Sequence, residues 1–235
     1  MLLTFSTPDY ADRLAVLLAS CERNDPDSMV WVHCICWPDS QLLRARRRFP
    51  QYYFIPECGN DDIAADLAAG RRSGAVLRLK PTLLMNACDF AAPEGEPVVW
   101  VDADTVVTRP VAPMIARVDA EGDFGVTYRP GQRDHAKFAV AVMYFRHTPM
   151  ARRVLQAYAR ETERTAGRGD WFHDQLALWE IYRRTPAARL VPLRDDEHTL
   201  AGNPDAIFVS RRTSFEMDRL RNLLTTKQIT IPELT

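Results

Sequence analysis

Two aspartates separated by one residue follow the most apolar stretch in the middle of the chain. Pro97–Val101 (PVVWV) predicts a buried strand, and Asp102-Ala103-Asp104 comes directly after it. Because side chains at i and i+2 of an extended chain point the same way, we expect the two carboxylates side by side. Two carboxylates about 4 Å apart repel by roughly 4 kcal/mol at an effective dielectric constant near 20. A bound Mn²⁺ or Mg²⁺ ion removes that cost and keeps positions open for diphosphate oxygens.

An Asp-x-Asp pattern is weak evidence by itself, because short patterns occur by chance. Asp25-Pro26-Asp27 has the same pattern, and we interpret it as a turn. Asp102 and Asp104 are distinguished by their position at the end of a buried central strand. The alternative is that they only cap the following loop or helix.

Alternating strands and helices predict an α/β fold around this pair. The expected strands are Leu2–Ser6, Met29–Cys36, Gln51–Ile55, Pro97–Val101, Phe124–Thr127, Ala139–Phe145, Leu190–Leu193 and Ala206–Val209. The expected helices are Tyr10–Cys21, Gln41–Arg48, Ala75–Ala92, Met150–Thr162 and Phe172–Tyr182. We expect Asp9 to cap the first helix, and Pro81 to lie in the first turn of its helix or to kink it. Parallel sheets bind ligands beyond the carboxyl ends of their strands, here after Ser6, Cys36 and Val101.

Length and composition indicate a globular protein. The 235 residues are 46% hydrophobic and 26% charged, with a formal net charge of −1. We predict a single domain over 1–235, with 215–235 forming a C-terminal helix and tail. The charge favours neither nucleic acid nor an anionic membrane as a partner. Five cysteines without a CxxC pair indicate buried thiols rather than disulfides or a zinc ribbon. No apolar run reaches the ~18 residues of a membrane span and no targeting segment is visible, so we expect a cytoplasmic protein.

Several stretches together resemble one enzyme family. They are T4-F5-S6-T7 with Tyr10, R78-L79-K80-P81, V99-W100-V101-D102-A103-D104, F138-A139-V140-A141-V142-M143-Y144-F145 and D170-W171-F172-H173-D174-Q175-L176. In this order the chain resembles nucleotide-diphospho-sugar glycosyltransferases of the GT-A fold, most closely the retaining enzymes related to glycosyltransferase family 8. The resemblance covers roughly residues 2 to 210. It implies a Rossmann-like GT-A domain with a mixed, mainly parallel central sheet flanked by helices.

The resemblance also implies a role for individual residues. Asp102 and Asp104 would bind the metal ion, and His198 is a candidate third ligand. Asp174 and Gln175 would act at the donor sugar and the reacting bond. The nucleotide-sugar would contact Thr7, Tyr10, Arg78, Lys80, Asp102 and Ala103. The chain departs from the family pattern at Ala139 (asparagine in the family), Ala141 (glycine) and Ser210 (a metal-binding histidine in many relatives).

The activity that follows from the resemblance is metal-dependent transfer of a hexose or pentose, with retention of configuration. The donor would be a nucleotide-sugar such as a UDP-sugar, and the acceptor could be a glycan, lipid, protein or modified nucleic acid. Each residue also has a structural explanation. Arg78 and Lys80 could solvate a helix, Asp174 could favour a helix N-terminus, and Tyr10 could cover the core. The basic cluster of Arg44, Arg46, Arg47 and Arg48 could likewise be a solvated helix face.

Two other functions remain open from the sequence. The VVWVDADTV run also matches the first motif of haloacid-dehalogenase-type phosphatases, with Asp102 as nucleophile, Asp195-Asp196 as the magnesium motif and Lys137 as the lysine. That motif normally opens its domain, whereas about a hundred residues precede it here. A GT-A-fold nucleotidyltransferase is disfavoured because the loop after Ser6 lacks the glycines that cradle a triphosphate. A non-catalytic nucleotide-sugar binder is the remaining alternative.

Overall fold

The computed structural model describes residues 1–57, 61–69, 74–91, 96–166, 173–185, 187–200 and 203–210. These residues belong to two compact units, each assembled from separate stretches of the chain. The first unit comprises Met1–Cys58, Val101–Met114 and Arg194–Thr235, and the second comprises Gly59–Trp100 and Ile115–Leu193. The chain passes from the second unit to the first at the end of the strand that precedes Asp102.

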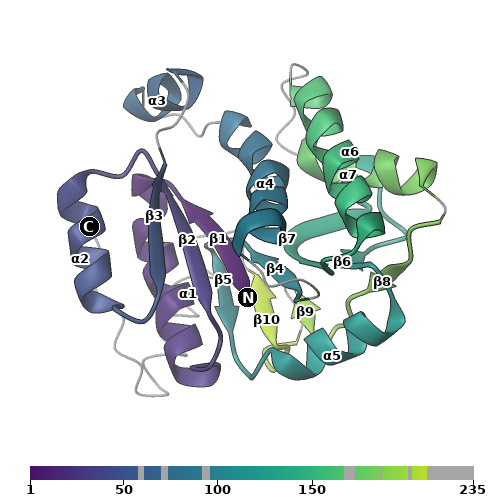
Figure 1. The fold of residues 1–235 in the computed structure, drawn as a ribbon, viewed down its shortest axis with the longest axis horizontal. Coiled ribbons are helices and arrows are strands. Elements are labelled where there is room, and N and C mark those ends of the chain that lie inside the picture. Colours follow the sequence, from purple (N-terminus) through teal and green to yellow (C-terminus); the bar gives the residue numbers. More distant parts are fainter. Residues whose placement is uncertain are drawn as a thin grey trace. The chain divides into compact units, whose positions relative to one another are not determined.

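Three parallel strands form the sheet of the first unit, in the order β3-β2-β1. They are β1 (Leu2–Ser6), β2 (Val30–Ile35) and β3 (Tyr53–Glu57). A 3-10 turn, η1 (Pro8–Tyr10), leads into α1 (Ala11–Asn24), and α2 (Asp39–Arg48) packs against β3 (Figure 1). Strands β1 and β2 are mostly buried and mainly apolar, as expected of parallel strands covered on both faces.

A small second sheet in the first unit lies directly after the Asp-Ala-Asp run. Its strands are β5 (Thr105–Val107), β10 (Phe208–Ser210) and β9 (His198–Thr199), in the order β5-β10-β9. Helix α1 fixes β5 through two hydrogen bonds at Val107: Ser20 Oγ accepts from its N–H at 2.9 Å, and Asn24 Nδ2 donates to its carbonyl at 2.9 Å. The strand that follows the two aspartates is therefore held by a buried helix.

The second unit contains four strands in the order β4-β7-β6-β8. They are β4 (Val98–Val101), β6 (Phe124–Tyr128), β7 (Phe138–Phe145) and β8 (Leu190–Pro192). Its helices are α3 (Asp61–Ala68), α4 (Gly74–Asn86) with a π turn η2 (Ala87–Ala91), α6 (Pro149–Ala166) and α7 (His173–Arg184). Helix α5 (Ala112–Glu121) runs across the boundary between the units, and η3 (Asp134–Ala136) precedes β7. Strand β6 pairs with β8 in parallel and with β7 antiparallel.

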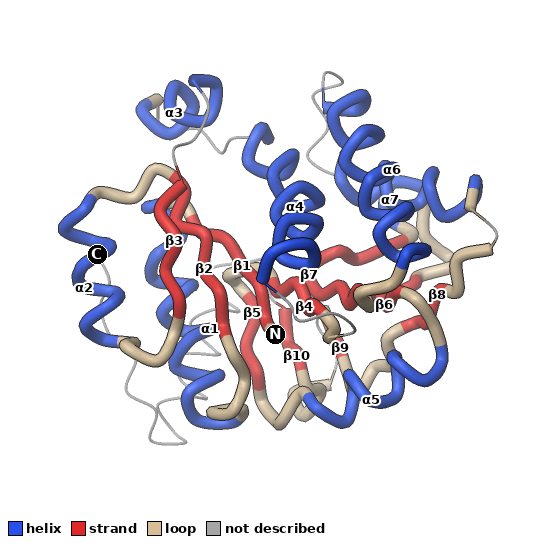
Figure 2. The backbone as a smooth tube through the Cα atoms, viewed as in Figure 1, coloured by secondary structure: helices blue, strands red, loops and turns tan. Residues whose placement is uncertain are grey.

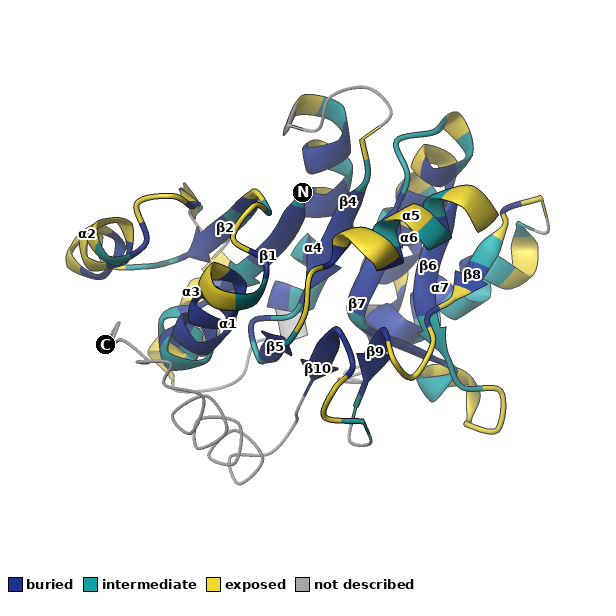
Figure 3. Cartoon of the chain, turned by 90° about the horizontal axis from the view of Figure 1, so that it is seen from below, coloured by how far each residue is buried: buried dark blue, intermediate teal, exposed yellow. Residues whose placement is uncertain are grey.

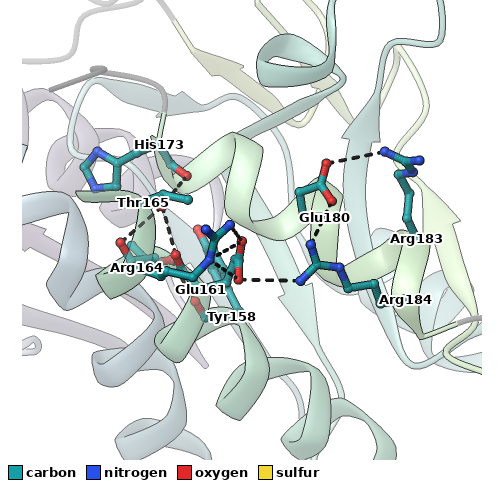
Figure 4. Close-up of polar contacts among 9 residues, drawn as sticks. Tyr158, Glu161, Arg164, Thr165, His173, Glu180, Arg183 and Arg184 are labelled. Carbon is teal, nitrogen blue, oxygen red and sulfur yellow. Dashed lines mark hydrogen bonds and ion pairs between the residues drawn. The ribbon is translucent and has the colours of Figure 1, made fainter. Parts of the chain in front are cut away.

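Helix α6 packs against both α4 and α7 within the second unit (Figure 2). Figure 4 shows the polar contacts that join α6 to α7. Glu161 on α6 is almost buried, and its carboxylate binds Arg164 and lies 3.7 Å from the guanidinium of Arg184 on α7. Thr165 Oγ1 lies 3.5 Å from the carbonyl oxygen of His173, the first residue of α7. These contacts fix the beginning of α7, which carries Asp174 and Gln175.

Apolar side chains fill the interior of both units, and the strands are mostly buried (Figure 3). In the second unit the core is rich in aromatic rings. Phe124 stacks on Phe145 with ring centroids 5.8 Å apart, and Phe138 meets Trp179 edge-on at 5.5 Å. This packing supports β6, β7 and α7 together.

The predicted fold class is confirmed, because the sheet is mixed and mainly parallel and helices flank it. Every predicted strand and helix that falls on described residues is present, with ends shifted by a few residues. The segment 215–235 lies outside the described residues. The single domain over residues 1–235 stays a prediction.

Other expectations about the elements were wrong. Asp9 does not cap α1, because the 3-10 turn of Pro8–Tyr10 precedes that helix and the Asp9 carboxylate accepts from Thr7 Oγ1 at 2.6 Å. Pro81 lies in the interior of α4 and not in its first turn, and the alternative expectation, that it kinks the helix, stays a prediction. Four further elements, α3, α5, β5 and β9, were not predicted from the sequence.

Candidate functional site

The residues expected to bind the donor divide between the two units, and each group is described by itself. In the first unit, Asp102-Ala103-Asp104 forms a turn rather than an extended segment. The Thr105 N–H donates to the Asp102 carbonyl at 3.0 Å, which closes the turn. Ala103 is buried at 6% exposure, whereas Asp102 and Asp104 are both partly exposed. The small alanine thus packs inward, and two carboxylates remain in contact with solvent at the end of β4.

Arg13 is a neighbour of this turn that the sequence analysis missed. A guanidinium nitrogen of Arg13 lies 3.8 Å from Asp104 Oδ2. The same guanidinium lies over the ring of Tyr10, with Cζ 4.5 Å from the ring centroid. Tyr10 and Arg13 are three residues apart at the beginning of α1, a spacing that places side chains on one face. That spacing was the only signal in the sequence for Arg13.

Three buried polar side chains form a row of hydrogen bonds that begins at Thr105, the residue directly after the turn. Thr105 Oγ1 and Ser210 Oγ are 2.7 Å apart, and Ser210 Oγ is 3.1 Å from His198 Nε2. Thr105 and His198 have no exposed surface, and Ser210 has 2%. His198 therefore bonds to the residue that stands where many relatives have their histidine. The role of His198 as a metal ligand stays a prediction.

The donor set of the turn suits a hard divalent cation. No three His, Cys, Asp or Glu side chains gather into a metal-binding group among the residues that the structure describes. Mg²⁺ and Mn²⁺ are commonly held by one or two carboxylates, with substrate phosphates and water in the other positions. Two partly exposed aspartates at a strand end match this pattern, so the residues present fit such an ion.

The loop after β1 places Thr7 and Tyr10 close together in the first unit. The Tyr10 N–H donates to the Thr7 carbonyl at 3.0 Å. Thr7 is buried and its hydroxyl is bonded to Asp9, whereas Tyr10 is partly exposed. Tyr10 is thus the better placed of the two to contact a nucleoside.

The loop after β2 contains the only positive φ of a non-glycine residue in the described part of the chain. Cys36 has φ 56°, and its N–H donates to the Glu57 carbonyl at 3.0 Å. His33 Nδ1 lies 2.8 Å from Glu57 Oε1. These contacts join β2 to β3.

In the second unit, Lys80 and Asp174 form a buried ion pair. Lys80 Nζ lies 3.2 Å from Asp174 Oδ2, and the two side chains are 1% and 4% exposed. Lys80 Nζ also donates to the Val140 carbonyl at 3.4 Å and lies 5.3 Å from the centroid of the Trp100 ring. The other oxygen of Asp174 accepts from the Gln175 N–H at 2.8 Å. Lys80 therefore holds Asp174 in place from inside the unit.

The Lys80 contact falls on an irregular part of β7. The register between β6 and β7 shifts between Val126 and Thr127, which pair with Met143 and Ala139. Val140 lies in the interval of β7 that has no partner in β6, and its carbonyl accepts from Lys80. Ala141, in the same interval, is partly exposed, whereas Ala139, which pairs with Thr127, is buried. The two departures from the family pattern thus border the residue that binds Lys80.

Gln175 has a basic partner of its own. Arg129 donates from one terminal nitrogen to Gln175 Oε1 at 3.4 Å and to the Phe138 carbonyl at 3.4 Å. Two consecutive residues at the beginning of α7 are therefore each held by a cation, Asp174 by Lys80 and Gln175 by Arg129. Nothing in the sequence analysis pointed to Arg129.

Arg78 and Lys80 do not come together. Residues two apart on a helix face in different directions. Arg78 lies 4.0 Å from Glu163 on α6, whereas Lys80 binds Asp174. Two arginines of the basic cluster on α2 also have structural partners. Arg46 donates to the Phe54 carbonyl at 2.8 Å, and Arg48 lies 3.2 Å from Glu22.

Two residues of the phosphatase hypothesis, Lys137 and Asp196, have contacts elsewhere, the latter through its backbone. Lys137 donates to the Pro130 carbonyl and lies 5.9 Å from the centroid of the Trp179 ring. The carbonyl of Asp196 accepts from Arg109 at 2.8 Å and from the Ile207 N–H at 3.0 Å. Asp196 therefore fastens the loop that precedes β9.

Comparison with solved structures identifies the fold. The chain is similar to the glycosyltransferase GlyE of Streptococcus pneumoniae TIGR4, with 11% identity, a TM-score of 0.62 and coverage of 99% of this chain and 64% of GlyE. It is similar to the galactosyltransferase LgtC in complex with donor and acceptor sugar analogues, with 13% identity, a TM-score of 0.63 and coverage of 99% and 98%. It also resembles mouse xyloside xylosyltransferase 1, with 11% identity, a TM-score of 0.56 and coverage of 89% and 96%. No protein-family model and no curated protein sequence matches the chain.

These likenesses confirm the expected fold, which is the fold of GT-A glycosyltransferases. The chain spans 64% of the length of GlyE. No helix in the described part of the chain is both long enough and apolar enough to cross a membrane.

Proposed function

We propose that the chain is a glycosyltransferase that moves a hexose or pentose from a nucleoside diphosphate sugar, such as a UDP-sugar, to an acceptor. The observation that carries the proposal is the turn of Asp102-Ala103-Asp104. It presents two partly exposed carboxylates at the end of β4, in a chain with a glycosyltransferase fold. The acceptor, whether a glycan, lipid, protein or modified nucleic acid, remains open in this proposal.

Asp102 and Asp104 would hold a Mn²⁺ or Mg²⁺ ion together with the diphosphate of the donor. Such an ion neutralises the negative charge of the departing nucleoside diphosphate when it is bound. Arg13 lies beside Asp104 and adds a positive charge in the same place. Tyr10, one helical turn away, offers an aromatic ring to the nucleoside.

Asp174 and Gln175 would bind the donor sugar. Asp174 is oriented at both oxygens, by the Lys80 ammonium and by the Gln175 N–H. An oriented carboxylate of this kind can stabilise the positive charge that develops on the sugar as the glycosidic bond breaks. Lys80 acts through Asp174, because its ammonium is bonded to that carboxylate. Retention of configuration is the outcome that the family resemblance favours.

We also propose a cytoplasmic location. Cys21, Cys34 and Cys88 are buried free thiols, and Cys36 is a partly exposed one. Free thiols are typical of a reducing compartment.

The proposal is tested by turnover of nucleotide-sugars. Purified protein is incubated with Mn²⁺ and UDP-glucose, UDP-galactose, UDP-xylose or GDP-mannose, and the released nucleoside diphosphate is measured. We expect slow hydrolysis of at least one donor, which Asp104→Ala abolishes. Asp27→Ala is the matched control, since Asp27 is the exposed aspartate of the other Asp-x-Asp, in the turn after α1. The proposal fails if no donor is hydrolysed, or if Asp102→Asn abolishes a phosphatase activity instead.

A further inference from the structure

Arg13 links two residues that the proposed function assigns to different parts of the donor. Its guanidinium lies 4.5 Å above the Tyr10 ring, the candidate contact of the nucleoside. It also lies 3.8 Å from Asp104, a candidate ligand of the cation. The side chains of Arg13 and Asp104 are 22% and 20% exposed. The stacking on Tyr10 therefore keeps a permanent positive charge beside one of the two carboxylates.

This charge acts against a bare divalent cation. A guanidinium within a few ångströms of a bound Mn²⁺ ion repels it, and in a partly hydrated site the repulsion weakens binding by about tenfold. No third acidic, thiol or imidazole group joins Asp102 and Asp104 among the described residues to offset that repulsion. In addition, the hydroxyl of Ser210 is bonded to Thr105 Oγ1 at 2.7 Å. The turn by itself is thus a weak metal site.

The same charge attracts a nucleoside diphosphate. Two phosphate groups carry more negative charge than the cation balances, so a nearby guanidinium stabilises the bound complex. Arg13 therefore disfavours binding of the bare cation, but it favours binding of the cation together with the diphosphate.

We propose that Arg13 makes cation binding at Asp102 and Asp104 dependent on the nucleoside diphosphate, so that the cation and the diphosphate enter as a pair. This inference rests on the proposed function and adds an order of binding to it. Because Arg13 repels the cation and attracts the diphosphate, removing its charge should change the affinity for each ligand, in opposite directions.

The test compares Mn²⁺ and UDP binding in native protein and in Arg13→Met, which keeps the length of the side chain and removes its charge. Isothermal titration calorimetry measures the affinity for Mn²⁺ alone, and the affinity for UDP at saturating Mn²⁺. We expect Arg13→Met to tighten Mn²⁺ binding about tenfold and to weaken UDP binding about tenfold. These opposite changes in affinity distinguish a charge effect from a loss of structure, because a loss of structure would weaken the binding of both ligands.

Two control variants sharpen the result. Arg13→Lys retains the positive charge and should keep both affinities close to native. Arg23→Met removes an exposed charge from the same helix and should change neither. Circular dichroism melting of each variant monitors folding.

The outcomes distinguish this inference from the function on which it rests. Native protein that binds Mn²⁺ with UDP, together with an Arg13→Met variant whose Mn²⁺ affinity is unchanged or weaker, overturns the role of Arg13 alone. If neither native protein nor Arg13→Met binds Mn²⁺ with UDP, both the inference and the proposed function are overturned.

Discussion

The ammonium of Lys80 lies 3.2 Å from the carboxylate of Asp174, and both side chains are almost completely buried. Removing one member of a buried ion pair leaves the other charge uncompensated, at a cost of about 3–5 kcal/mol. We expect Lys80→Met to lower the free energy of unfolding by that amount in urea titrations.

The second half of this experiment is the double variant Lys80→Met with Asp174→Asn. It removes both charges and should recover part of the lost stability. A Lys80→Met protein as stable as the native one would show that the pair is not formed in solution.

The contact between Arg129 and Gln175 predicts which end of the Gln175 amide faces the donor. Arginine has only donors, so the amide oxygen turns toward Arg129 and the NH₂ group is left to contact the sugar. Gln175→Glu keeps an acceptor for Arg129 but removes the NH₂ donor. We expect kcat to fall by about 10- to 100-fold while KM for the donor changes less.

Arg129→Met provides the complementary variant, because it leaves the amide present but free to rotate. We expect a smaller decrease of kcat, on the order of tenfold, that Arg129→Lys partly restores. Unchanged turnover in both Gln175→Glu and Arg129→Met would remove Gln175 from the reaction.

Buried thiols predict how stability depends on pH. Burial raises the pKa of Cys34 and of Cys88 from 9.0 to about 12, with Asp89 adding to the rise at Cys88. Below pH 9 both thiols are protonated in the folded and unfolded states. Between pH 9 and about 12 only the unfolded chain releases the protons, so stability falls by about 1.4 kcal/mol per pH unit for each thiol.

Urea unfolding at several pH values between 8 and 10.5 measures this slope. Cys34→Ala should make the slope of stability against pH shallower, because it removes one of the buried thiols. If the free energy of unfolding falls with pH equally steeply in native protein and in Cys34→Ala, the buried Cys34 thiol is not a source of the pH dependence.

The bond between His198 and Ser210 predicts a mainly structural role for this pair. Ser210→Ala leaves His198 Nε2 and Thr105 Oγ1 without their shared buried partner, which costs about 1–3 kcal/mol. We expect lower stability of Ser210→Ala and of His198→Gln, and an affinity for Mn²⁺ with UDP that changes by less than about threefold. A loss of more than tenfold in His198→Gln would instead make His198 a metal ligand.

The sequence predicted the elements whose hydrophobic pattern is unambiguous. The buried runs of β1, β2, β4 and β7 and the periodic helices α1, α6 and α7 could be read directly, because burial on both faces or on one helical face determines residue type. Short strands such as β5 and β9 were not predicted, because two or three residues are too few to show a periodic hydrophobic pattern. The 3-10 turn before α1 escaped because Pro8 and Asp9 are equally typical of a helix start.

The residues of the candidate site could be predicted only where they are close together in the sequence, within one short motif. Asp102 and Asp104 stand out by their place after β4, although they form a turn and not the extended segment that we expected. Arg129 meets Gln175 from 46 residues away, and Lys80 meets Asp174 from 94 residues away. Such pairs depend on the packing of distant elements, which hydrophobic periodicity does not specify.

The central claim is that Asp104 helps to hold a cation that recruits a nucleotide-sugar. The most direct measurement is the melting temperature of native protein and of Asp104→Ala, with UDP-glucose, UDP-galactose or UDP-xylose, in the presence and absence of Mn²⁺. A ligand that binds only the folded state raises the melting temperature. We expect a rise for native protein that requires both Mn²⁺ and nucleotide-sugar and that Asp104→Ala lacks. A rise of the same size in Asp104→Ala, or none in native protein with any donor, would contradict the claim.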